Sequence, residues 1–219
     1  GGYAALPDDR LQAALAPHYT ARFDAEYAWT VYGSGDVELH LHVAPSEGLP
    51  QLPRIGVELE LPGAYDTFTW YGRGPHEAYA DRKESARVGV YRGSVDEQYV
   101  PYIMPEENGN KTEVRWAAFS AANGVGLLAA GKPWLNFSAH HFTTQELTQA
   151  RHTCDLTPHP EITLNLDYAQ SGLGSASCGP GRLEKYQLKA VETRFNVRLR
   201  PFDTRSEDPM ALSKQAFPG

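Results

Sequence analysis

The amino-acid sequence predicts an all-β protein, an antiparallel sandwich of about a dozen short strands. Apolar and polar residues alternate with a period of two in many short runs, which is the pattern of a half-buried strand. Turn signals that contain glycine or proline separate these runs at regular spacing, and only two short segments carry helix signals. Neither an internal repeat nor a firm boundary interrupts residues 19–203, so we expect one domain there.

Before residue 62 the sequence predicts a short helix or linker and then three strands. Residues 1–18 hold an alanine-rich helical pattern at 8–16, which is equally compatible with a linker from a preceding domain. The residues that follow alternate in runs separated by turn residues. The expected strands are 23–31, 37–43 and 54–61, the first two forming a hairpin around the turn at 33–36.

Between residues 62 and 142 the expected strands are interrupted by two irregular segments. The first is the polar stretch 70–82, and the second is 97–110, where Pro101, Pro105 and Gly109 prevent a long regular element. Asn123-Gly124 is the strongest short hairpin signal in the chain. The expected strands are 67–71, 112–120, 126–130 and 135–139.

After residue 142 the sequence predicts one capped helix, three strands and a tail. Thr143 followed three residues later by Glu146 is the capping-box pattern, so we expect a short helix at 143–150. Small residues dominate 171–181, which predicts a loop. The expected strands are 162–168, 183–190 and 192–200, and residues 204–219 have the composition of a tail.

Composition argues against several classes of function. The formal net charge is −7 and no basic run occurs, which argues against a nucleic-acid surface. No apolar stretch approaches the roughly 20 residues that a membrane helix needs, and no signal peptide opens the sequence. We therefore expect a cytoplasmic protein with neither nucleic-acid nor membrane partners. The sequence starts at Gly1-Gly2 without an initiator methionine, so we expect a piece of a longer protein.

Cysteine and histidine spacing does not indicate a metal site, and none is expected in this chain. Cys154 and Cys178 are the only cysteines, and whether they pair stays open. The eight histidines lack the spacing of a structural zinc site. His140 and His141 are adjacent, so on a strand their side chains point to opposite faces and do not easily bind one ion.

The densest polar stretch is 70–82, which reads Trp-Tyr-Gly-Arg-Gly-Pro-His-Glu-Ala-Tyr-Ala-Asp-Arg. Its glycines permit backbone angles that a side chain would forbid, and Pro75 fixes one φ angle. Such a segment can hold its ionisable side chains in one fixed network. The network is either purely structural or it braces a carbohydrate site, and its candidate members are Arg73, Glu77, Asp81 and Arg82.

Acidic residues are numerous enough for glycoside hydrolysis, which needs two carboxyl groups about 5 to 10 Å apart. Most of them lie in turns beside Arg, Asn or Gly, where a structural role is favoured, and nothing selects a catalytic pair. The loop 171–181 lacks the Gly-x-Ser-x-Gly pattern of a hydrolase nucleophile, and we interpret it as a flexible lip. The acids considered are Glu77, Asp81, Glu106, Glu107, Asp155 and Asp167.

Aromatic side chains offer a second route to carbohydrate recognition, because the C–H faces of a pyranose stack on rings. For any single ring, packing in the core of the sandwich is the favoured interpretation. The rings considered are Trp70, Tyr71, Tyr79, Trp116, Trp134 and Phe142.

Residues 71–82 closely resemble the Gly-Pro-x-Glu-Asn-Tyr-x-Asp-Arg signature of the C-terminal small-chain domain of β-galactosidases, in glycoside hydrolase family two. Residues 99–110, Tyr-Val-Pro-Tyr-Ile-Met-Pro-Glu-Glu-Asn-Gly-Asn, continue the resemblance, which covers about residues 19–203. Shorter matching segments are 52–56, 137–139, 146–147, 150–152, 155–156, 164–167, 172–180 and 198–201.

The resemblance implies an antiparallel supersandwich similar to the galactose mutarotase-like fold. It also implies that the full-length enzyme hydrolyses terminal β-D-galactosides such as lactose, with its catalytic glutamates and its magnesium and sodium ligands in a central (β/α)8 barrel. We therefore expect no catalytic residue in this chain and no activity from it alone. The implied partners are the galactoside substrate, the other domains of the same polypeptide and further copies in a homo-oligomer.

The resemblance further implies that this domain lends a loop to the rim of the active site and carries a structural motif. The implied rim candidates are Ser175, Ser177 and Cys178, and the implied structural motif is Arg73, Glu77, Asp81, Arg82 and Asn108. Two departures from the family pattern occur. Ala78 and Ala80 replace the Asn and Pro of the signature, and Cys178 stands near the position where some relatives carry a stacking tryptophan.

Two other functions stay open from the sequence. A stand-alone aldose 1-epimerase or carbohydrate-binding domain could use the same fold, and an epimerase needs a histidine acid and a glutamate base that face one cleft. The residue types are present without the epimerase motifs, as His76, His140, His141 and Glu77. A purely structural interface domain is the other possibility, and it predicts an exposed apolar face.

Overall fold

The structure of the chain is a computed structural model that describes residues 21–174 and 179–216. Its described part is all-β and antiparallel, which confirms the fold class predicted from the sequence. The strands are β1 (Phe23–Val31), β2 (Val37–Pro45), β3 (Arg54–Leu61), β4 (Thr67–Gly74), β5 (Arg87–Ser94), β6 (Lys111–Ser120), β7 (Val125–His140), β8 (Ile162–Gln170) and β9 (Thr193–Asp203). Short helices are α2 (Thr144–Gln149) and α3 (Pro209–Ser213), and single 3-10 turns are η1 (Gly63–Tyr65), η2 (Asp96–Gln98), η3 (Thr153–Asp155) and η4 (Glu184–Tyr186).

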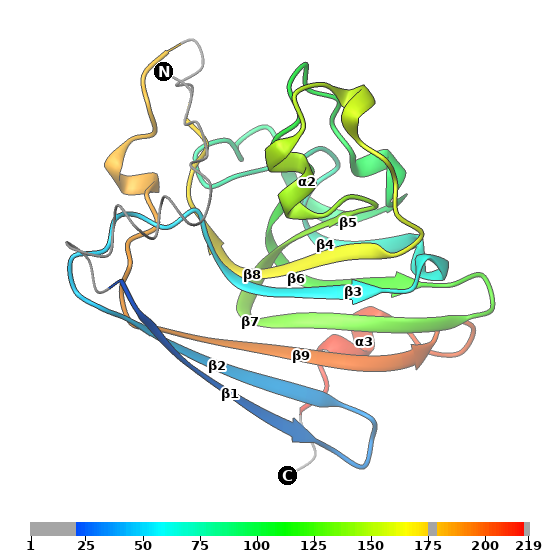
Figure 1. Ribbon diagram of the computed structural model, residues 1–219. Coiled ribbons are helices and arrows are strands. Elements are labelled where there is room, and N and C mark those ends of the chain that lie inside the picture. Colours follow the sequence, from blue (N-terminus) through cyan, green and yellow to red (C-terminus); the bar gives the residue numbers. More distant parts are fainter. Residues whose placement is uncertain (1–20, 175–178, 217–219) are drawn as a thin grey trace.

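The strands form one branched hydrogen-bonded network (Figure 1). The main path runs β1-β2-β9-β7-β6-β4-β5, and β8 pairs with both β7 and β3. The network divides at β7, because residues 125–131 pair with β9 whereas residues 136–140 pair with β8. One long strand thus belongs to both arms of the sheet.

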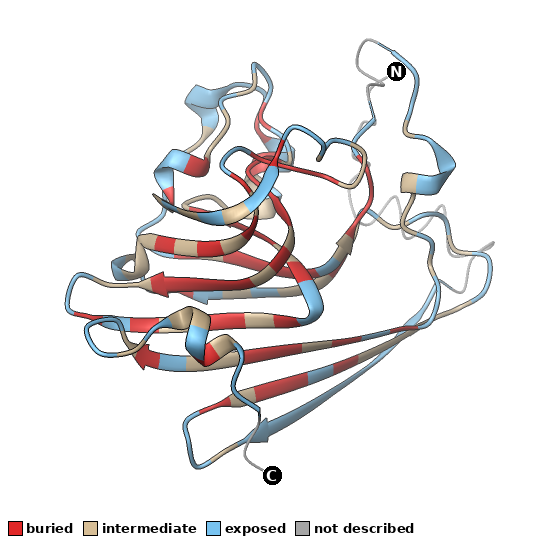
Figure 2. Cartoon of the chain, turned by 180° about the vertical axis from the view of Figure 1, so that it is seen from behind, coloured by how far each residue is buried: buried red, intermediate tan, exposed pale blue. Residues whose placement is uncertain are grey.

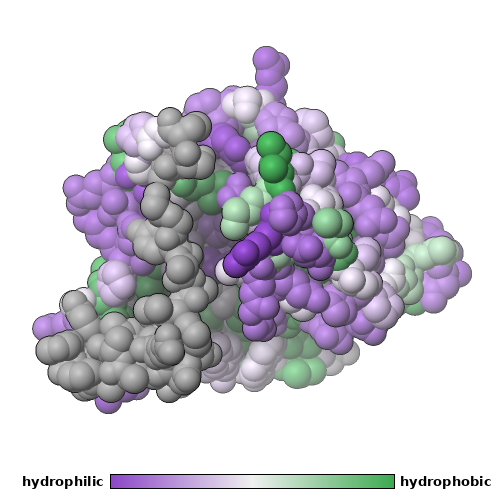
Figure 3. Space-filling model, turned by 45° about the horizontal axis from the view of Figure 1, so that its top comes forward, coloured by the Kyte–Doolittle hydropathy of each residue, from purple (hydrophilic) through white to green (hydrophobic). Residues whose placement is uncertain are grey.

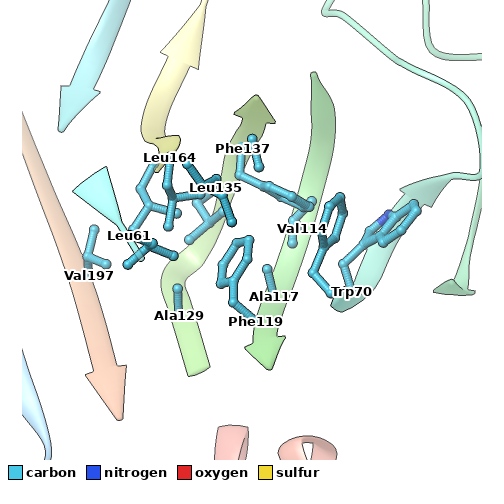
Figure 4. Packing of buried hydrophobic residues seen from close by; sticks show 14 of the residues in the cluster. Leu61, Trp70, Val114, Ala117, Phe119, Ala129, Leu135, Phe137, Leu164 and Val197 are labelled. Atoms are coloured by element: carbon cyan, nitrogen blue, oxygen red, sulfur yellow. The ribbon is translucent and has the colours of Figure 1, made fainter. Parts of the chain in front are cut away.

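The hydrophobic core lies between the β3–β8 arm and the arm that contains β9, β7, β6 and β4 (Figures 2 and 4). Phe68, Phe119 and Phe137 pack together at its centre, with ring centroids 5.4 to 5.8 Å apart. Leu61 and Leu164 come from the β3–β8 arm. Burial of each such side chain stabilises the fold by about 1.5–3 kcal/mol. The period-two alternation places these side chains on the same face of each strand, so it determines which face is buried.

Three local predictions are confirmed. β1 and β2 form the expected hairpin, with Val31 opposite Val37 at the turn. Gly124 has a φ of +91° between β6 and β7, a conformation that favours glycine. The capping box at the start of α2 is present, because the Glu146 N–H donates to Thr143 Oγ1 at 3.1 Å and the Thr143 N–H donates to Glu146 Oε2 at 2.8 Å.

The strand expected at 183–190 is wrong. The Tyr186 N–H donates to the Leu183 carbonyl at 2.9 Å, which closes the turn η4. In this segment Leu188 alone makes a β contact, an isolated bridge with Leu52. Residues 183–190 therefore form a turn through local hydrogen bonds, because no described strand pairs with them along their length.

Two further strands differ from the prediction. β5 is not among the predicted strands, and it forms because β4 offers it a complete antiparallel partner from Thr67 to Gly74. The separate strands expected at 126–130 and 135–139 are both parts of β7, which changes its neighbour instead of ending.

The segment after Asp203, expected as a tail, contains the packed helix α3. The Asp208 side chain accepts a hydrogen bond from the Met210 N–H at 3.1 Å and caps the helix. Leu212 is buried in a second, smaller cluster that includes Trp116, Leu128 and Phe202. Burial of Leu212 fixes this segment to the outer side of the sheet.

The helix expected at 8–16 lies outside the described residues. Among the helices that the structure describes, none has the length and apolar character needed to cross a membrane.

Candidate functional site

The segment between β4 and β5, residues 75–86, carries three residues of the predicted structural motif, Glu77, Asp81 and Arg82. Trp70 is 1% exposed and its Nε1 donates to the Arg73 carbonyl at 2.9 Å, which fixes the end of β4. Asn110 holds the middle of the segment, because it exchanges two hydrogen bonds of 2.8 Å with the backbone of Ala78. Ala78 is fully buried, so the departure from the family signature at this position is accommodated inside the protein.

Glu77 connects three parts of the chain. Its Oε1 accepts hydrogen bonds from Arg82 and from the Tyr102 hydroxyl, and its Oε2 accepts one from the Gly109 N–H at 2.8 Å. The Arg82 guanidinium lies 5.3 Å from the ring centroid of Tyr79, within cation–π range. The predicted pairing of Glu77 with Arg82 is therefore present, and it ties the segment 75–86 to the irregular segment 99–110.

Asn108 organises that irregular segment from within. Its Oδ1 accepts from the Val100 N–H at 3.0 Å and its Nδ2 donates to the Glu106 carbonyl at 2.9 Å. The Asn108 carbonyl lies 2.9 Å from Nε2 of the buried His140. Burial lowers the pKa of His140 to about 4, so the imidazole is neutral and Nε2 donates. Asn108 thus replaces the hydrogen bonds that a strand would otherwise supply.

A second group of ionisable residues surrounds Arg54 at the start of β3. Its guanidinium contacts the Asp167 carboxylate on β8 and, at 3.2 Å, Glu107. Burial raises the pKa of both acids, and Arg54 opposes the rise. Gln170 Nε2 donates to Asp167 at 2.9 Å, and the Tyr79 hydroxyl donates to Glu107 at 3.4 Å. Glu107 and Asp167 are thus both engaged in internal ion pairs and hydrogen bonds.

Arg73 does not join the Glu77 network, although the sequence grouped the two residues. Its Nε donates to Glu113 at 2.9 Å, and its Nη1 donates to the carbonyls of Lys83 and Ala86 at 3.0 and 2.9 Å. Lys83 also contacts Glu113. Arg73 therefore fixes the far end of the segment 75–86 instead of the Glu77 side.

Asp81 holds the base of the small-residue loop. Its carboxylate accepts hydrogen bonds from the N–H groups of Leu173 at 3.1 Å and Gly174 at 2.7 Å. Gly172 is required there, because a Cβ at that position would lie 2.6 Å from Asp81 Cγ. The Gly172 carbonyl accepts from Arg182 at 3.2 Å on the returning side of the loop.

The rim candidates Ser175, Ser177 and Cys178 lie outside the described residues. The described residues on either side of them in the sequence line a hollow of about 390 Å³. It is lined by Asp81, Arg82, Leu173, Gly174, 180–183 and Tyr186. The end of the molecule that carries this loop is mostly hydrophilic (Figure 3).

The aromatic candidates divide into buried and accessible rings. Trp70, Tyr79 and Trp116 are at most 2% exposed, so their faces are not available to a sugar. Phe142 packs against Tyr99, with the ring centroids 5.4 Å apart. Tyr71 and Phe142 are half-buried, whereas Trp134 is 43% exposed, with Arg115 5.3 Å from its ring centroid.

The residues considered for an epimerase do not converge. His140 is buried, and His141 Nδ1 lies 3.0 Å from the His159 carbonyl, where only a protonated nitrogen can make a hydrogen bond. His76 is on the surface beside Ser85. Glu77 is already bonded to three donors, so it does not face one cleft together with His76, His140 or His141.

Asp155 is also structural, because its carboxylate accepts from the N–H groups of Arg151 and His152 at 3.1 and 2.9 Å. In residues 21–174 and 179–216, His, Cys, Asp and Glu do not form a group of three or more that could hold a metal ion. Cys154 is exposed, and its possible partner Cys178 is outside the described part.

Several residues of this region escaped the sequence analysis. Arg54 and Gln170 lie in strands, where nothing distinguishes them from ordinary polar positions. Lys111 is 1% exposed, donates to the Gly109 carbonyl at 2.9 Å and lies 5.4 Å from the ring centroid of Trp70. Burial lowers the pKa of Lys111 to about 8. The sequence signal for Lys111 was its position directly after Asn108-Gly109-Asn110, the end of the segment that resembles the family.

Fold and site together define a β-sheet domain whose charged residues brace its own loops. The chain belongs to the β-galactosidase small chain family, because the model of that family matches residues 8–199.

Curated relatives support this assignment. The chain is 40% identical over 146 residues to a β-galactosidase of Priestia megaterium, covering 67% of this chain and 14% of that protein. It is 36% identical over 216 residues to one of an Arthrobacter species, covering 90% and 20%. It is 34% identical over 197 residues to one of Photobacterium profundum, covering 88% and 18%. The chain thus spans a fifth or less of these relatives.

Among solved structures, a chain from Escherichia coli K12 that is provisionally named an aldose 1-epimerase aligns with 84% of this chain and 62% of its own length. The two are 13% identical, with a TM-score of 0.44.

Proposed function

We propose that this chain is the small-chain domain of a β-galactosidase that hydrolyses terminal β-D-galactosides of the lactose type. Its role there is to support the rim of the active site and the assembly of the enzyme. The catalytic glutamates are assigned to another domain of the same polypeptide. The carboxylates at the centre of the described site, Glu77, Glu107 and Asp167, are all engaged in internal hydrogen bonds and ion pairs, which supports this division of labour.

The observation that carries the proposal is the contact of Asp81 with the loop. One carboxylate holds two consecutive N–H groups of Leu173 and Gly174, directly before the rim candidates Ser175, Ser177 and Cys178. Charge-assisted hydrogen bonds of this kind are about twice as strong as neutral ones. The signature segment therefore holds the base of this loop, which suits a domain that contributes to an active site built elsewhere.

The proposed partners are the galactoside substrate, other domains of the same polypeptide and further copies in a homo-oligomer. The exposure of β1 supports a partner on this face, because the strand is exposed along its whole length. It presents Tyr27, Trp29 and Val31 on one side, where another domain or a second copy could cover them. Magnesium and sodium are proposed for the complete enzyme, with ligands outside the described residues. A cytoplasmic location stays a prediction.

The test compares the isolated chain with the complete polypeptide in which it stands. We expect the complete protein to release nitrophenol from a nitrophenyl β-galactoside and the isolated chain to release none. Release by the isolated chain, or no release by the complete protein, contradicts the proposal.

A matched pair of variants in the complete protein tests the role of the loop. Asp81→Asn is expected to lower kcat/KM about tenfold or more, because the loop base loses its charged acceptor. Asp155→Asn removes a similar backbone acceptor far along the chain and is expected to change kcat/KM less than twofold. Equal effects of the two substitutions contradict the rim role.

A further inference from the structure

A second cavity, of about 280 Å³, lies beneath α3 on the outer side of the sheet. None of the residues that brace the loop lines it. Its walls come from β2, β4, β6, β7 and β9 and from the residues of and after α3. Representative lining residues are Tyr71, Trp116, Ala130, Pro133, Asn196 and Met210.

The wall formed by α3 is held firmly in place. Arg198 is 6% exposed, and its Nη1 donates to the carbonyls of Leu212 at 3.2 Å and Gln215 at 2.9 Å. Asp36, which is fully buried, fixes Arg198 by accepting a hydrogen bond of 2.6 Å from its Nε. The burial of Leu212 adds an apolar anchor. The cavity is therefore a built feature of the described structure.

One wall of this cavity lies beyond the residues that match the family. The matched residues end at 199, whereas one wall consists of residues 210–216. What occupies the cavity must be argued from its own chemistry.

Trp116 supplies the first indication of a ligand. It is 2% exposed and lines the cavity, and its Nε1 has no acceptor in the described part of the chain. Buried donors are nearly always hydrogen-bonded in native proteins, so an acceptor on a bound molecule would complete this one. Met210, Pro133 and Ala130 line the same cavity, and ligand pockets are typically apolar with a few placed polar groups.

The charges around the cavity supply the second indication. Arg115, Lys132, Arg198 and Lys214 line it, against Glu38 as the acidic lining residue. Asp36 already neutralises one of these cations by pairing with Arg198. Arg115 and Lys214 still outnumber Glu38 in the lining, which favours an anion over a neutral sugar.

We propose that the cavity beneath α3 binds a small carboxylate that carries an apolar or aromatic body. One carboxylate oxygen accepts from Trp116 Nε1, the cations stabilise the negative charge, and the body packs against the apolar wall. The volume is close to the lower end of the range for small-molecule sites, about 300 to 1,000 Å³, so the ligand is small.

The test is a titration of the 15N-labelled chain with benzoate, followed through the indole N–H resonances. We expect a saturable shift of the Trp116 resonance. The Trp70 indole, which donates to the Arg73 carbonyl, and the Trp29 indole on β1 serve as internal controls and should stay in place. Absence of a saturable Trp116 shift overturns the proposal.

Variants and other probes separate the two parts of the proposed ligand. Trp116→Phe, which lacks the N–H, is expected to weaken benzoate binding at least tenfold by calorimetry, and Lys214→Gln several-fold. Benzyl alcohol, inorganic phosphate and galactose are expected to bind at least tenfold more weakly than benzoate. Equal binding of any of these three overturns the proposed ligand class, and unchanged affinity in Lys214→Gln overturns the role of charge.

Discussion

A buried carboxylate such as Glu77 stabilises a fold as long as donors surround it. Glu77 is 9% exposed and receives hydrogen bonds from Arg82, Tyr102 and the Gly109 N–H. Burial and the Glu77 carboxylate both raise the pKa of Tyr102, which keeps its hydroxyl protonated as a donor. This arrangement gives a sharp prediction for one substitution.

Glu77→Ala is expected to lower the free energy of unfolding by about 1–3 kcal/mol, because three donors lose their acceptor. The effect stays within this range because Arg82 is half exposed, and water screens its ion pair with Glu77. For a chain of this size the melting temperature should fall by about 2–4 °C per kcal/mol. Thermal denaturation followed by circular dichroism measures it. Glu184→Ala removes an exposed partner of Lys189 and should leave the melting temperature unchanged. A stable Glu77→Ala protein contradicts the bracing role.

His140 makes stability depend on pH. Its pKa is about 4 in the folded protein against an ordinary value of 6.5, so between these values the unfolded chain binds more protons. The contribution of His140 is therefore complete above pH 6.5 and is lost as the pH falls toward 4. We expect this one group to remove about 2 kcal/mol of stability between pH 7 and pH 5.

The measurement is urea denaturation of the wild type and of His140→Gln at both pH values. Glutamine keeps an N–H donor for the Asn108 carbonyl but does not titrate, so the pH dependence should shrink by about 2 kcal/mol. His76→Gln, on the surface, is the control and should keep the wild-type dependence. An unchanged difference in His140→Gln contradicts this explanation.

At this scale the sequence predicts contacts within one segment and misses those between strands. Glu77 and Arg82 are five residues apart, so their pairing was foreseeable. Arg54 and Asp167 are 113 residues apart and meet only because β3 pairs with β8. Arg73 was misgrouped because Glu113, its partner, lies on a different strand.

At the scale of elements, the loop base formed by residues 172–174 depends on Asp81. Asp81→Asn is expected to speed hydrogen exchange of the Leu173 and Gly174 amides about tenfold or more, because the two charge-assisted hydrogen bonds weaken. Exchange measured by NMR tests this, with Asp155→Asn as the matched control. Unchanged protection of the two amides contradicts a holding role for Asp81.

The secondary structure shows where local patterns suffice. The capping box of α2 and the Asn-Gly turn before β7 were predictable, because each is decided by residues a few positions apart. β5 was missed because Gly89 and Gly93 weaken its pattern, yet β4 pairs with it throughout. Pairing with a neighbouring strand determines whether such a segment is extended, and the local sequence does not show which strand that neighbour is.

At the scale of the whole molecule, β1 is an edge strand, which pairs only with β2 among the described strands. Its residues are exposed throughout, with Tyr27 at 53% and Trp29 at 52% on the side that continues the core face of β2. A long apolar edge strand is prone to pair with another chain. We expect the isolated chain to self-associate at high concentration.

Sedimentation velocity should detect this self-association, and Trp29→Lys should reduce it by placing a charge on the edge strand. Val191→Lys, at an exposed site outside the strands, is the control and should leave it unchanged. A chain that remains monomeric at high concentration contradicts the expectation.

β7 has a further consequence. One half of β7 is hydrogen-bonded to β9 and the other half to β8. Separation of the two arms of the sheet would therefore break hydrogen bonds along β7. The nine described strands therefore share one continuous hydrogen-bonded network. We expect a single cooperative transition, in which slowly exchanging amides of β8 and β9 report the same opening free energy.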